Sequence, residues 1–365
     1  MLDFIRIACA VPAVKVGDVK KNAEDICGYI EKADAVNADI LLFPELALTG
    51  YSCGDLFFQD ALWNAVKRGM KEIADCSANH PNMTVVVGLP VWVERRLYNC
   101  AAVVARGEVC AIVPKTWLTT GEKRWFSPAS GLDNCWVEPE DIGLTSSQDF
   151  WSIPVNAKQI IRVGEDALVG IEICQDLMVP QPCSSALAVH GAEVILNLSA
   201  SAELAGKGDY RRELVRHQSA ACSCVYAYCS AGYTESTSDL VYSGQSMIAE
   251  NGRILAENGE LLQTDYMIVQ DCDLGRVRAD RQKSQYFGIS GHDGYLGRSP
   301  YVDHLRSDGS LYPLRKLVFV PSDKEERIQR CLEIFQIQVT GLKQRLKTIN
   351  SNAVIGISGG LDSTL

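Results

Sequence analysis

The chain has 365 residues, which is enough for one large domain or two ordinary ones. Its hydrophobic content of 47% and charged content of 22% are ordinary for a globular protein, and its net charge of −10 argues against a general nucleic-acid-binding surface. No apolar stretch is long enough to span a bilayer, and the N-terminus lacks the pattern of a secretory signal. We therefore expect a cytoplasmic protein that binds neither nucleic acid nor membrane.

The cysteines indicate the same compartment, and together with the histidines they bear on metal binding. The 14 cysteines are scattered, which indicates free thiols in a reducing cytosol rather than a disulfide framework. No CxxC pair occurs, and Cys222 and Cys224 have the wrong spacing for a zinc ribbon. The five histidines are isolated, so we predict no metal site.

Strand and helix patterns alternate over the first three quarters of the chain. The apolar run 4–11 predicts a strand, and the spacing of apolar residues over 18–36 predicts an amphipathic helix. Further strands are expected over 38–45, 83–91, 98–105, 108–115, 167–174, 192–199 and 224–231. Further helices are expected over 62–74, 184–191 and 210–222. The Asn251-Gly252 pair predicts a late hairpin, so the pattern as a whole indicates an α/β domain with helices outside a mixed sheet.

The last quarter of the chain has a different composition. Residues 276–323 are rich in Gly, Arg, Asp and Tyr, and we predict a connecting segment there. Residues 323–347 predict a helix with an apolar stripe formed by Ile328, Leu332, Phe335, Val339, Leu342 and Leu346. The final residues, NAVIGISGGLDSTL, predict a strand, a glycine turn and the first turn of a helix, as at the start of a second α/β domain.

Three residues far apart in the sequence each end a strand-like apolar run: Glu45, Lys115 and Cys174. A carboxylate, an amine and a thiol that meet at one edge of a sheet provide a base, an electrophile and a nucleophile for attack on an amide carbon. Each residue alone has an ordinary alternative. Glu45 could be a surface glutamate at the start of a loop, Lys115 a snorkelling surface lysine, and Cys174 a buried structural cysteine.

The segments around these three residues resemble the nitrilase, or carbon–nitrogen hydrolase, superfamily, which uses a Glu–Lys–Cys triad on an αββα sandwich. Residues 197–220 and 231–252 resemble the glutaminase domain of the glutamine-dependent NAD+ synthetases. The final ISGGLDST is similar to the pyrophosphate loop that opens the synthetase domain of those enzymes. The resemblance implies a nitrilase-like glutaminase domain over 1–275, a connecting segment over 276–323, and the start of an ATP-pyrophosphatase-type domain over 324–365. That second domain would have an adenine-nucleotide-hydrolase-like α/β fold and would continue beyond this chain.

The resemblance also implies roles for residues at matching positions. Glu45 would be the general base and Cys174 the nucleophile. Lys115 and the backbone N–H of Gln175 would hold the oxyanion, and Glu122 would help to position the lysine and the substrate. The reaction would hydrolyse glutamine through a cysteine thioester and supply ammonia for the ATP-dependent amidation of deamido-NAD+, which makes the whole enzyme a ligase. We expect Cys174→Ala to abolish the glutaminase activity.

Other residues would bind the substrates. Tyr51 would line the glutamine pocket, and Ser201 and Lys207 would grip the α-amino and α-carboxyl groups of glutamine. A glycine turn that enters a helix can place N–H groups and a positive dipole on a phosphate, although a plain glycine turn is the alternative. The residues that would bind the pyrophosphate of ATP are Ser358, Gly359, Gly360, Asp362 and Ser363. ATP and Mg2+ are implied for the synthetase half and no cofactor for the glutaminase half, and a homo-oligomer is expected by resemblance only.

Two departures from the family keep other hypotheses open. The family usually has Glu-Asp after the nucleophile, where this chain has Gln175-Asp176, and the stretch 116–121 is shorter than the usual Tyr-rich loop. A catalytically weak, dimerising scaffold domain is one alternative, but the intact triad argues against it. A free-standing nitrilase-family amidase is another, and the terminal loop argues against it. A different ATP-pyrophosphatase enzyme with SGGxDS is disfavoured by the triad.

Overall fold

The computed structural model of the chain describes residues 3–132, 135–146, 152–259, 262–287, 305–314, 320–321 and 323–364. The chain divides into two compact units, Met1–Tyr312 and Pro313–Leu365. Among the described residues, none of the helices combines the length and apolar character that a membrane crossing requires.

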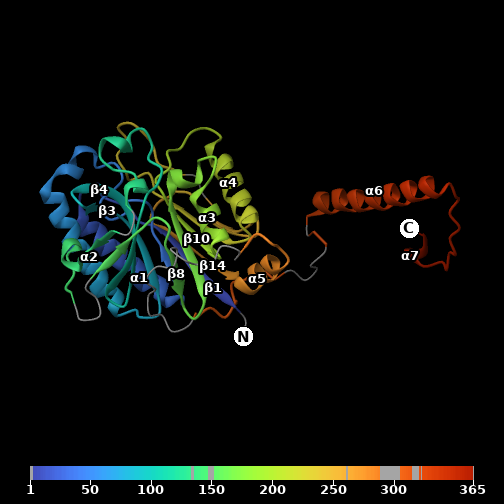
Figure 1. Ribbon diagram of the computed structural model, residues 1–365, viewed down its shortest axis with the longest axis horizontal. Coiled ribbons are helices and arrows are strands. Elements are labelled where there is room, and N and C mark those ends of the chain that lie inside the picture. Colours follow the sequence, from blue (N-terminus) through green and yellow to red (C-terminus); the bar gives the residue numbers. More distant parts are fainter. Residues whose placement is uncertain are drawn as a thin grey trace. The chain divides into compact units, whose positions relative to one another are not determined.

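Two β-sheets form the centre of the larger unit (Figure 1). The strands of the first sheet are β1 (Phe4–Val11), β2 (Ile40–Leu42), β3 (Thr84–Val93), β4 (Arg96–Ala105), β5 (Glu108–Pro114), β6 (Cys135–Val137), β7 (Ile153–Val155) and β14 (Tyr266–Asp273). The strands of the second sheet are β8 (Ile160–Val163), β9 (Ala167–Ile173), β10 (Val194–Ser199), β11 (Val225–Ser230), β12 (Ser246–Glu250) and β13 (Arg253–Glu257). Their orders are β14-β1-β2-β3-β4-β5-β7-β6 and β13-β12-β11-β10-β9-β8.

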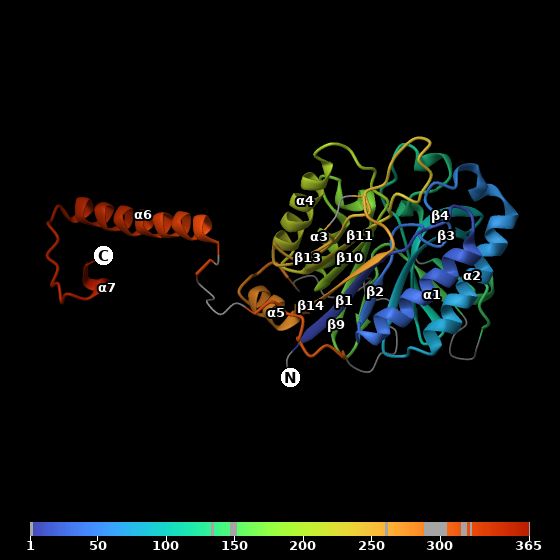
Figure 2. The same ribbon diagram turned by 180° about the vertical axis from the view of Figure 1, so that it is seen from behind.

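Helices cover the outer faces of both sheets. The helices of this unit are α1 (Val19–Ala35), α2 (Asp60–Ala78), α3 (Cys183–Val189), α4 (Lys207–Ala221) and α5 (Leu274–Gln282). Figures 1 and 2 show α1 and α2 on one side of the paired sheets and α3 and α4 on the other. Three separate apolar clusters fill the spaces between these four layers. The predicted αββα sandwich is therefore confirmed.

The first strand shows why the central strands have uninterrupted apolar sequences. In β1, Ile5 and Ile7 belong to the cluster between the two sheets, whereas Ala8 and Ala10 belong to the cluster under α1 and α2. Successive side chains of a strand face opposite sides of its sheet, so a strand that is covered on both faces needs apolar residues at every position.

The topology brings several strand ends to one edge. Strands β1, β2 and β3 run parallel, and so do β9, β10 and β11. The carboxyl ends of parallel strands lie at the same edge of a sheet, where ligand sites of α/β proteins are usually found. Glu45 follows β2, and its backbone N–H donates to the carbonyl of Ser199 at the end of β10, 3.2 Å away. The edges formed by the carboxyl ends of the parallel strands in the two sheets therefore meet at Glu45.

The structure differs from the predicted elements at the sheet edges and after residue 273. Strands β6, β7 and β8 are only three or four residues long, too short to give a periodic signal. Residues 276–282, which were predicted to connect domains, form most of α5. Its side chains Leu274 and Val277 are fully buried, but two apolar residues among many charged ones do not give a helical pattern.

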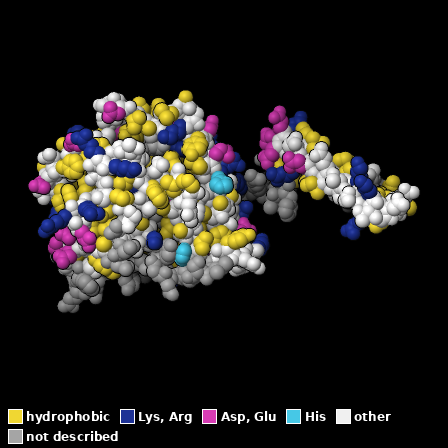
Figure 3. Space-filling view, turned by 45° about the horizontal axis from the view of Figure 1, so that its top comes forward, with side chains coloured by type: hydrophobic (Ala, Val, Ile, Leu, Met, Phe, Trp, Pro, Cys, Tyr) yellow, Lys and Arg dark blue, Asp and Glu magenta, His cyan; other side chains and the backbone are white. Residues whose placement is uncertain are grey.

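The smaller unit contains the helices α6 (Lys324–Ile349) and α7 (Leu361–Thr364). The helix predicted over 323–347 is confirmed as α6, which Asp323 caps by accepting a hydrogen bond from Glu326 N at 2.8 Å. None of its side chains is buried, and hydrophobic side chains lie along its surface in Figure 3. The strand predicted at 352–358 is wrong: these residues form no strand, because no neighbouring strand pairs with them in the described part of this unit.

Candidate active site

A buried cluster of charged and polar side chains lies where the two sheets meet. Lys115 Nζ is 2.5 Å from Glu45 Oε1 and 2.7 Å from Glu122 Oε1. Asn99 Nδ2 donates to the same two oxygen atoms, at 2.6 and 3.1 Å. All four residues are only 1% exposed, so the surface alternatives for Glu45 and Lys115 are wrong.

The backbone around Glu45 needs a glycine on the neighbouring strand. Pro44 ends the pairing of β2, and the chain turns closely over β3 at Gly88. A Cβ atom on Gly88 would lie 2.3 Å from Leu46 N and 2.5 Å from Pro44 O, closer than side chains come to backbone atoms. Gly88 therefore allows the turn that directs the Glu45 carboxylate to Lys115.

The cluster holds two carboxylates and one ammonium, so their proton affinities are coupled. Burial raises the pKa of Glu45 to about 8. The charge of Lys115 acts to lower this pKa, whereas the charge of Glu122 contributes to the rise. Burial also acts on Glu122, but Lys115 and the N–H of Thr119 outweigh it and lower the pKa of Glu122. Burial disfavours the charge on Lys115, yet the nearby anionic groups raise its pKa. Glu45 is therefore the member of the cluster whose pKa lies nearest to neutral pH.

Cys174 lies at a turn directly after β9. Its φ angle is +47°, a value that non-glycine residues rarely adopt, and it begins a 3₁₀ turn over Cys174–Leu177. The residue is 6% exposed. Burial raises the pKa of its thiol to about 12, and the charge of Glu45 contributes to the rise. Lys115 and the N–H of Ala200 act to lower this pKa. We call Glu45, Lys115 and Cys174 the triad.

The thiol needs a base at neutral pH because burial keeps it protonated. Glu45 Oε2 is buried and has no hydrogen-bond partner among the described residues, while Oε1 accepts from both Lys115 and Asn99. The carboxylate is thus anchored through one oxygen and has the other available. This arrangement suits a general base.

Tyr51 approaches the triad from the loop that follows Glu45. Burial raises the pKa of Tyr51, and the charges of Glu45 and Glu122 add to the shift. The loop is fixed by Glu235, a 4% exposed carboxylate that accepts Tyr51 N at 2.7 Å and Ser52 N at 3.0 Å. The ring of Tyr51 also lies edge-on to Tyr242, with ring centroids 5.6 Å apart.

The other residues that were predicted to bind glutamine differ in how closely they are connected to the triad. Gln175 follows the nucleophile and is half-buried. Ser201 is 3% exposed and follows Ala200, whose backbone N–H acts to lower the pKa of the Cys174 thiol. Lys207 is the first residue of α4 and is half-buried, and among the described residues its side chain has no hydrogen bond or ion pair to the triad.

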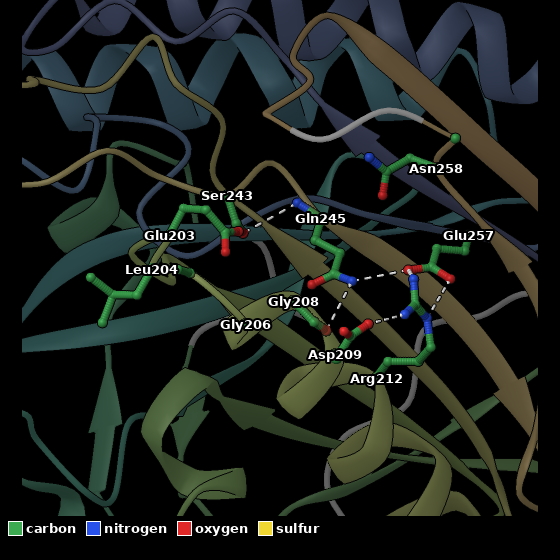
Figure 4. A pocket seen from close by; sticks show the side chains of 12 residues that line it. Glu203, Leu204, Gly206, Gly208, Asp209, Arg212, Ser243, Gln245, Glu257 and Asn258 are labelled. Carbon is green, nitrogen blue, oxygen red and sulfur yellow. Dashed lines mark hydrogen bonds and ion pairs between the residues drawn. The ribbon is translucent and has the colours of Figure 1, made fainter.

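Arg211 of α4 contacts the side chain of Ser201. Its guanidinium is buried, donates to Ser201 Oγ at 3.4 Å and to Gln245 Oε1 at 2.6 Å, and pairs with Glu203. Beside it lies a cavity of about 400 Å³, whose walls include the residues on either side of Lys207. Figure 4 shows that Arg212, one of its lining side chains, pairs with both Asp209 and Glu257.

The predicted pyrophosphate loop lies in the smaller unit. Gly359 has a φ angle of +85°, and Ser358 Oγ accepts a hydrogen bond from Gly360 N at 3.4 Å. The loop enters α7, in which Asp362 and Ser363 have helical backbone. Their side chains lie outside the described part of the structure. Among the described residues, no group of three or more His, Cys, Asp and Glu side chains is placed to hold a metal ion.

Three residues that organise this site were not predicted from the sequence. Asn99 interrupts the apolar run of β4, and a buried amide is unfavourable unless it has partners, so this interruption was a usable signal. Glu235 and Arg211 lie in polar stretches where nothing distinguishes them from surface residues. Their burial depends on segments distant in the sequence.

Comparison with known proteins identifies related sequences. A family model described as carbon-nitrogen hydrolase matches residues 6–282. Over 99% of its length the chain is 34% identical to a glutamine-dependent NAD+ synthetase from Mycobacterium tuberculosis and covers 54% of that protein. Over 58% of its length it is 28% identical to the glutamine-dependent NAD+ synthetase of Saccharomyces cerevisiae and covers 30% of it. The chain thus spans about half the length of the mycobacterial relative.

Solved structures show the same relationship at the level of the fold. A glutamine-dependent NAD+ synthetase from Cytophaga hutchinsonii matches 74% of this chain and 43% of its own, with a TM-score of 0.62 and 28% identity. An amidase from Nesterenkonia sp. matches 76% of this chain and 94% of its own, with a TM-score of 0.59 and 20% identity. At 20% identity the second similarity shows a shared fold alone.

Proposed function

The chain belongs to the carbon–nitrogen hydrolase family, and on that premise we propose that it hydrolyses the side-chain amide of glutamine, as the glutaminase half of a glutamine-dependent NAD+ synthetase. The observation that carries the proposal is the buried Lys115, which pairs with both Glu45 and Glu122 beside the strained turn of Cys174. This arrangement combines a base, a fixed cation and a nucleophile at the edge where the sheets meet.

The first half of the reaction forms a thioester. Glu45 takes the thiol proton while Cys174 Sγ attacks the carboxamide carbon of glutamine. The Lys115 ammonium and the backbone N–H of Gln175 stabilise the tetrahedral oxyanion, and such a donor typically contributes roughly 3–4 kcal/mol. Protonated Glu45 then returns its proton to the departing nitrogen. Ammonia leaves, and a γ-glutamyl thioester remains on Cys174.

The second half hydrolyses that thioester. Glu45, again a carboxylate, takes a proton from water as the water oxygen attacks the thioester carbon. The C–S bond breaks, the proton on Glu45 passes to the sulfur, and glutamate leaves. One difficult amide hydrolysis is thereby divided into two easier steps.

Glutamine would be held by residues around the triad. We propose Tyr51 as a wall of the pocket and Ser201, Lys207 and Gln175 as contacts to the amino-acid end of the substrate. The support is that the charges of Glu45 and Glu122 add to the rise that burial causes in the pKa of Tyr51, and that Ser201 follows Ala200, whose backbone N–H acts on the Cys174 thiol. Gln175 offers a neutral amide where the family usually has a carboxylate, so binding of the substrate ammonium would be weaker.

The synthetase half remains a proposal from the terminal loop and the relatives. Residues 324–365 would begin that domain, 1–275 would be the glutaminase, and 276–323 would connect them. ATP would be held through its pyrophosphate by Ser358, Gly359, Gly360, Asp362 and Ser363, and would activate the carboxylate of deamido-NAD+. The left-handed Gly359 and the following helix fit this use, because the bare backbone can approach a phosphate closely. Mg2+, a cytoplasmic location and homo-oligomerisation are part of the same proposal.

A free-standing amidase is the second candidate, because the triad by itself can attack any carboxamide and does not select glutamine. The two functions differ in substrate. We would measure ammonia and glutamate release from glutamine with the wild-type chain and with Cys174→Ala, and ammonia release from asparagine and simple amides. Turnover of glutamine in preference to the other amides, lost in the variant, is the expected result. Preference for simple amides would favour the amidase, and turnover retained by Cys174→Ala would contradict both.

A further inference from the structure

Asp176 connects the nucleophile turn to the lysine loop. Its carboxylate is 2% exposed and accepts three backbone hydrogen bonds. Oδ2 accepts Ile173 N at 3.1 Å and Thr116 N at 3.3 Å, and Oδ1 accepts Trp117 N at 2.7 Å. These donors come from two segments that lie far apart in the sequence.

The positions of these donors place Asp176 between two members of the triad. Ile173 directly precedes Cys174, and Thr116 directly follows Lys115. One side chain therefore fixes the backbone on both the nucleophile and the cation. The pairing of strands does not do this, because β9 and β5 belong to different sheets.

The lysine loop is held at its other end by Glu122. Glu122 Oε2 accepts Thr119 N at 2.7 Å, while its Oε1 binds Lys115. The short loop 116–121 is thus fixed by one buried carboxylate from each side, Asp176 and Glu122. The nucleophile also needs such support, because its φ angle of +47° is unfavourable unless its surroundings impose it.

We infer that Asp176 is a positioning residue that fixes the placement of Lys115 relative to Cys174, although the two residues follow strands of different sheets. The inference rests on the proposed cysteine-dependent hydrolysis of glutamine. It assigns Asp176 no contact with substrate, and its effect reaches the reaction through the placement of the other two residues. A displacement of reacting groups by about 1 Å can reduce a rate ~100-fold, so this control is large enough to measure.

The test uses Asp176→Asn, which keeps the size of the side chain. The amide presents one oxygen, so either the bond from Trp117 N or the bonds from both Ile173 N and Thr116 N are lost, and an NH2 group then faces backbone N–H donors. We expect kcat for glutamine to fall ~100-fold while KM changes less than about threefold. Glu172→Gln is the matched control. Glu172 is 1% exposed and lies on β9, two residues before Cys174, but it accepts Ser184 N of α3 at 2.7 Å and has no hydrogen bond to the lysine loop among the described residues.

A second readout does not depend on glutamine. Iodoacetamide alkylates Cys174 when the sulfur displaces iodide and the thiol proton passes through Glu45 to solvent, and peptide mass spectrometry distinguishes this cysteine from the other thiols. If Asp176 aligns the triad, alkylation slows in Asp176→Asn because the base and the cation no longer match the sulfur. If Asp176 only keeps the turn compact, alkylation accelerates because the buried thiol becomes exposed.

The outcomes separate the inference from the proposed function. Slower alkylation together with a loss of kcat in Asp176→Asn, and kcat within about threefold of wild type in Glu172→Gln, supports the inference. Wild-type kcat in Asp176→Asn, faster alkylation, or equal losses in both variants overturns it. If the wild-type chain itself does not hydrolyse glutamine, the proposed function fails, and the alkylation rates still decide the role of Asp176.

Discussion

Lys115 forms ion pairs with two carboxylates at once, and the two carboxylates differ in their other hydrogen bonds. Glu122 uses both oxygens for hydrogen bonds, to Lys115 and Asn99 through one and to Thr119 N through the other. Glu45 uses one oxygen and leaves the other without a partner among the described residues. The anion on Glu122 is therefore the better stabilised, and Glu45 is left to accept a proton.

The first prediction is a pH dependence that follows from this difference. Burial raises the pKa of Glu45 to about 8, and only its ionised form can take the thiol proton. We predict that kcat/KM for glutamine falls about tenfold for each pH unit below that pKa and levels off above it. A pH–rate profile of the wild-type chain measures this. A profile that is flat from about pH 6 to about pH 9 would contradict the raised pKa of Glu45 on which this prediction rests.

The second prediction concerns Asn99, which donates to both Glu45 and Glu122. Hydrogen bonds to charged groups contribute about 1.5–3 kcal/mol, so Asn99→Ala is predicted to lower kcat by roughly 10–100-fold. Asn22→Ala is the matched control, since Asn22 is an equally buried amide that binds the carbonyls of Lys15 and Leu48 instead. Similar kcat values in the two variants would show that Asn99 is merely structural.

The sequence allowed the triad residues to be proposed because each ends an apolar run at a strand terminus. It did not reveal how they are held. Asn99 gave a signal, an amide within an apolar strand, whereas Asp176 was noted only as part of the Gln175-Asp176 motif. The hydrogen bonds of Asp176 join β9 to the lysine loop, and no local pattern encodes a contact between different sheets.

At the scale of elements, α5 shows how a helix can be stabilised by a few polar contacts. Arg281 is 9% exposed, and its guanidinium donates to the carbonyls of Gly191, Ala192, Cys222 and Ser223. These carbonyls belong to the residues that directly follow the ends of α3 and α4. Charged residues dominate the α5 sequence, which is why its helical nature could not be predicted from apolar periodicity.

The third prediction is a loss of stability when this contact is removed. Arg281→Ala leaves several buried carbonyls without a donor, and we predict that the free energy of unfolding falls by about 3 kcal/mol. Arg276→Ala, on the same helix, is the matched control because its side chain is 50% exposed, and a loss below about 1 kcal/mol is predicted. Denaturant unfolding of both variants measures this. An equal effect would refute the clamping role of Arg281.

The predicted strand at 352–358 failed for a reason that also applies to elements. Its sequence has the apolar character of a strand, but a strand exists only through hydrogen bonds to a neighbour. In the described part of the smaller unit no such neighbour is present. The apolar sequence of this segment therefore led to a strand prediction that the structure does not support.

At the scale of the whole molecule, the sandwich creates the site by joining two sheets at one edge. Glu45 and Lys115 come from the ends of strands in the first sheet, and Cys174 comes from the second. The alternating strand and helix patterns predicted a mixed sheet with helices outside, and the family resemblance predicted the four layers. The sequence patterns did not define the pairing of the short edge strands, because three or four residues carry too little information.

The most direct test of the proposed function asks whether glutamine forms an acyl intermediate on Cys174. Hydroxylamine attacks a thioester faster than water does, so turnover of glutamine in its presence converts the γ-glutamyl group to a hydroxamate. We predict γ-glutamyl hydroxamate from the wild-type chain, in competition with glutamate, and none from Cys174→Ala. Glutamate release without any hydroxamate, or hydroxamate formed by Cys174→Ala, would contradict the thioester route through this residue.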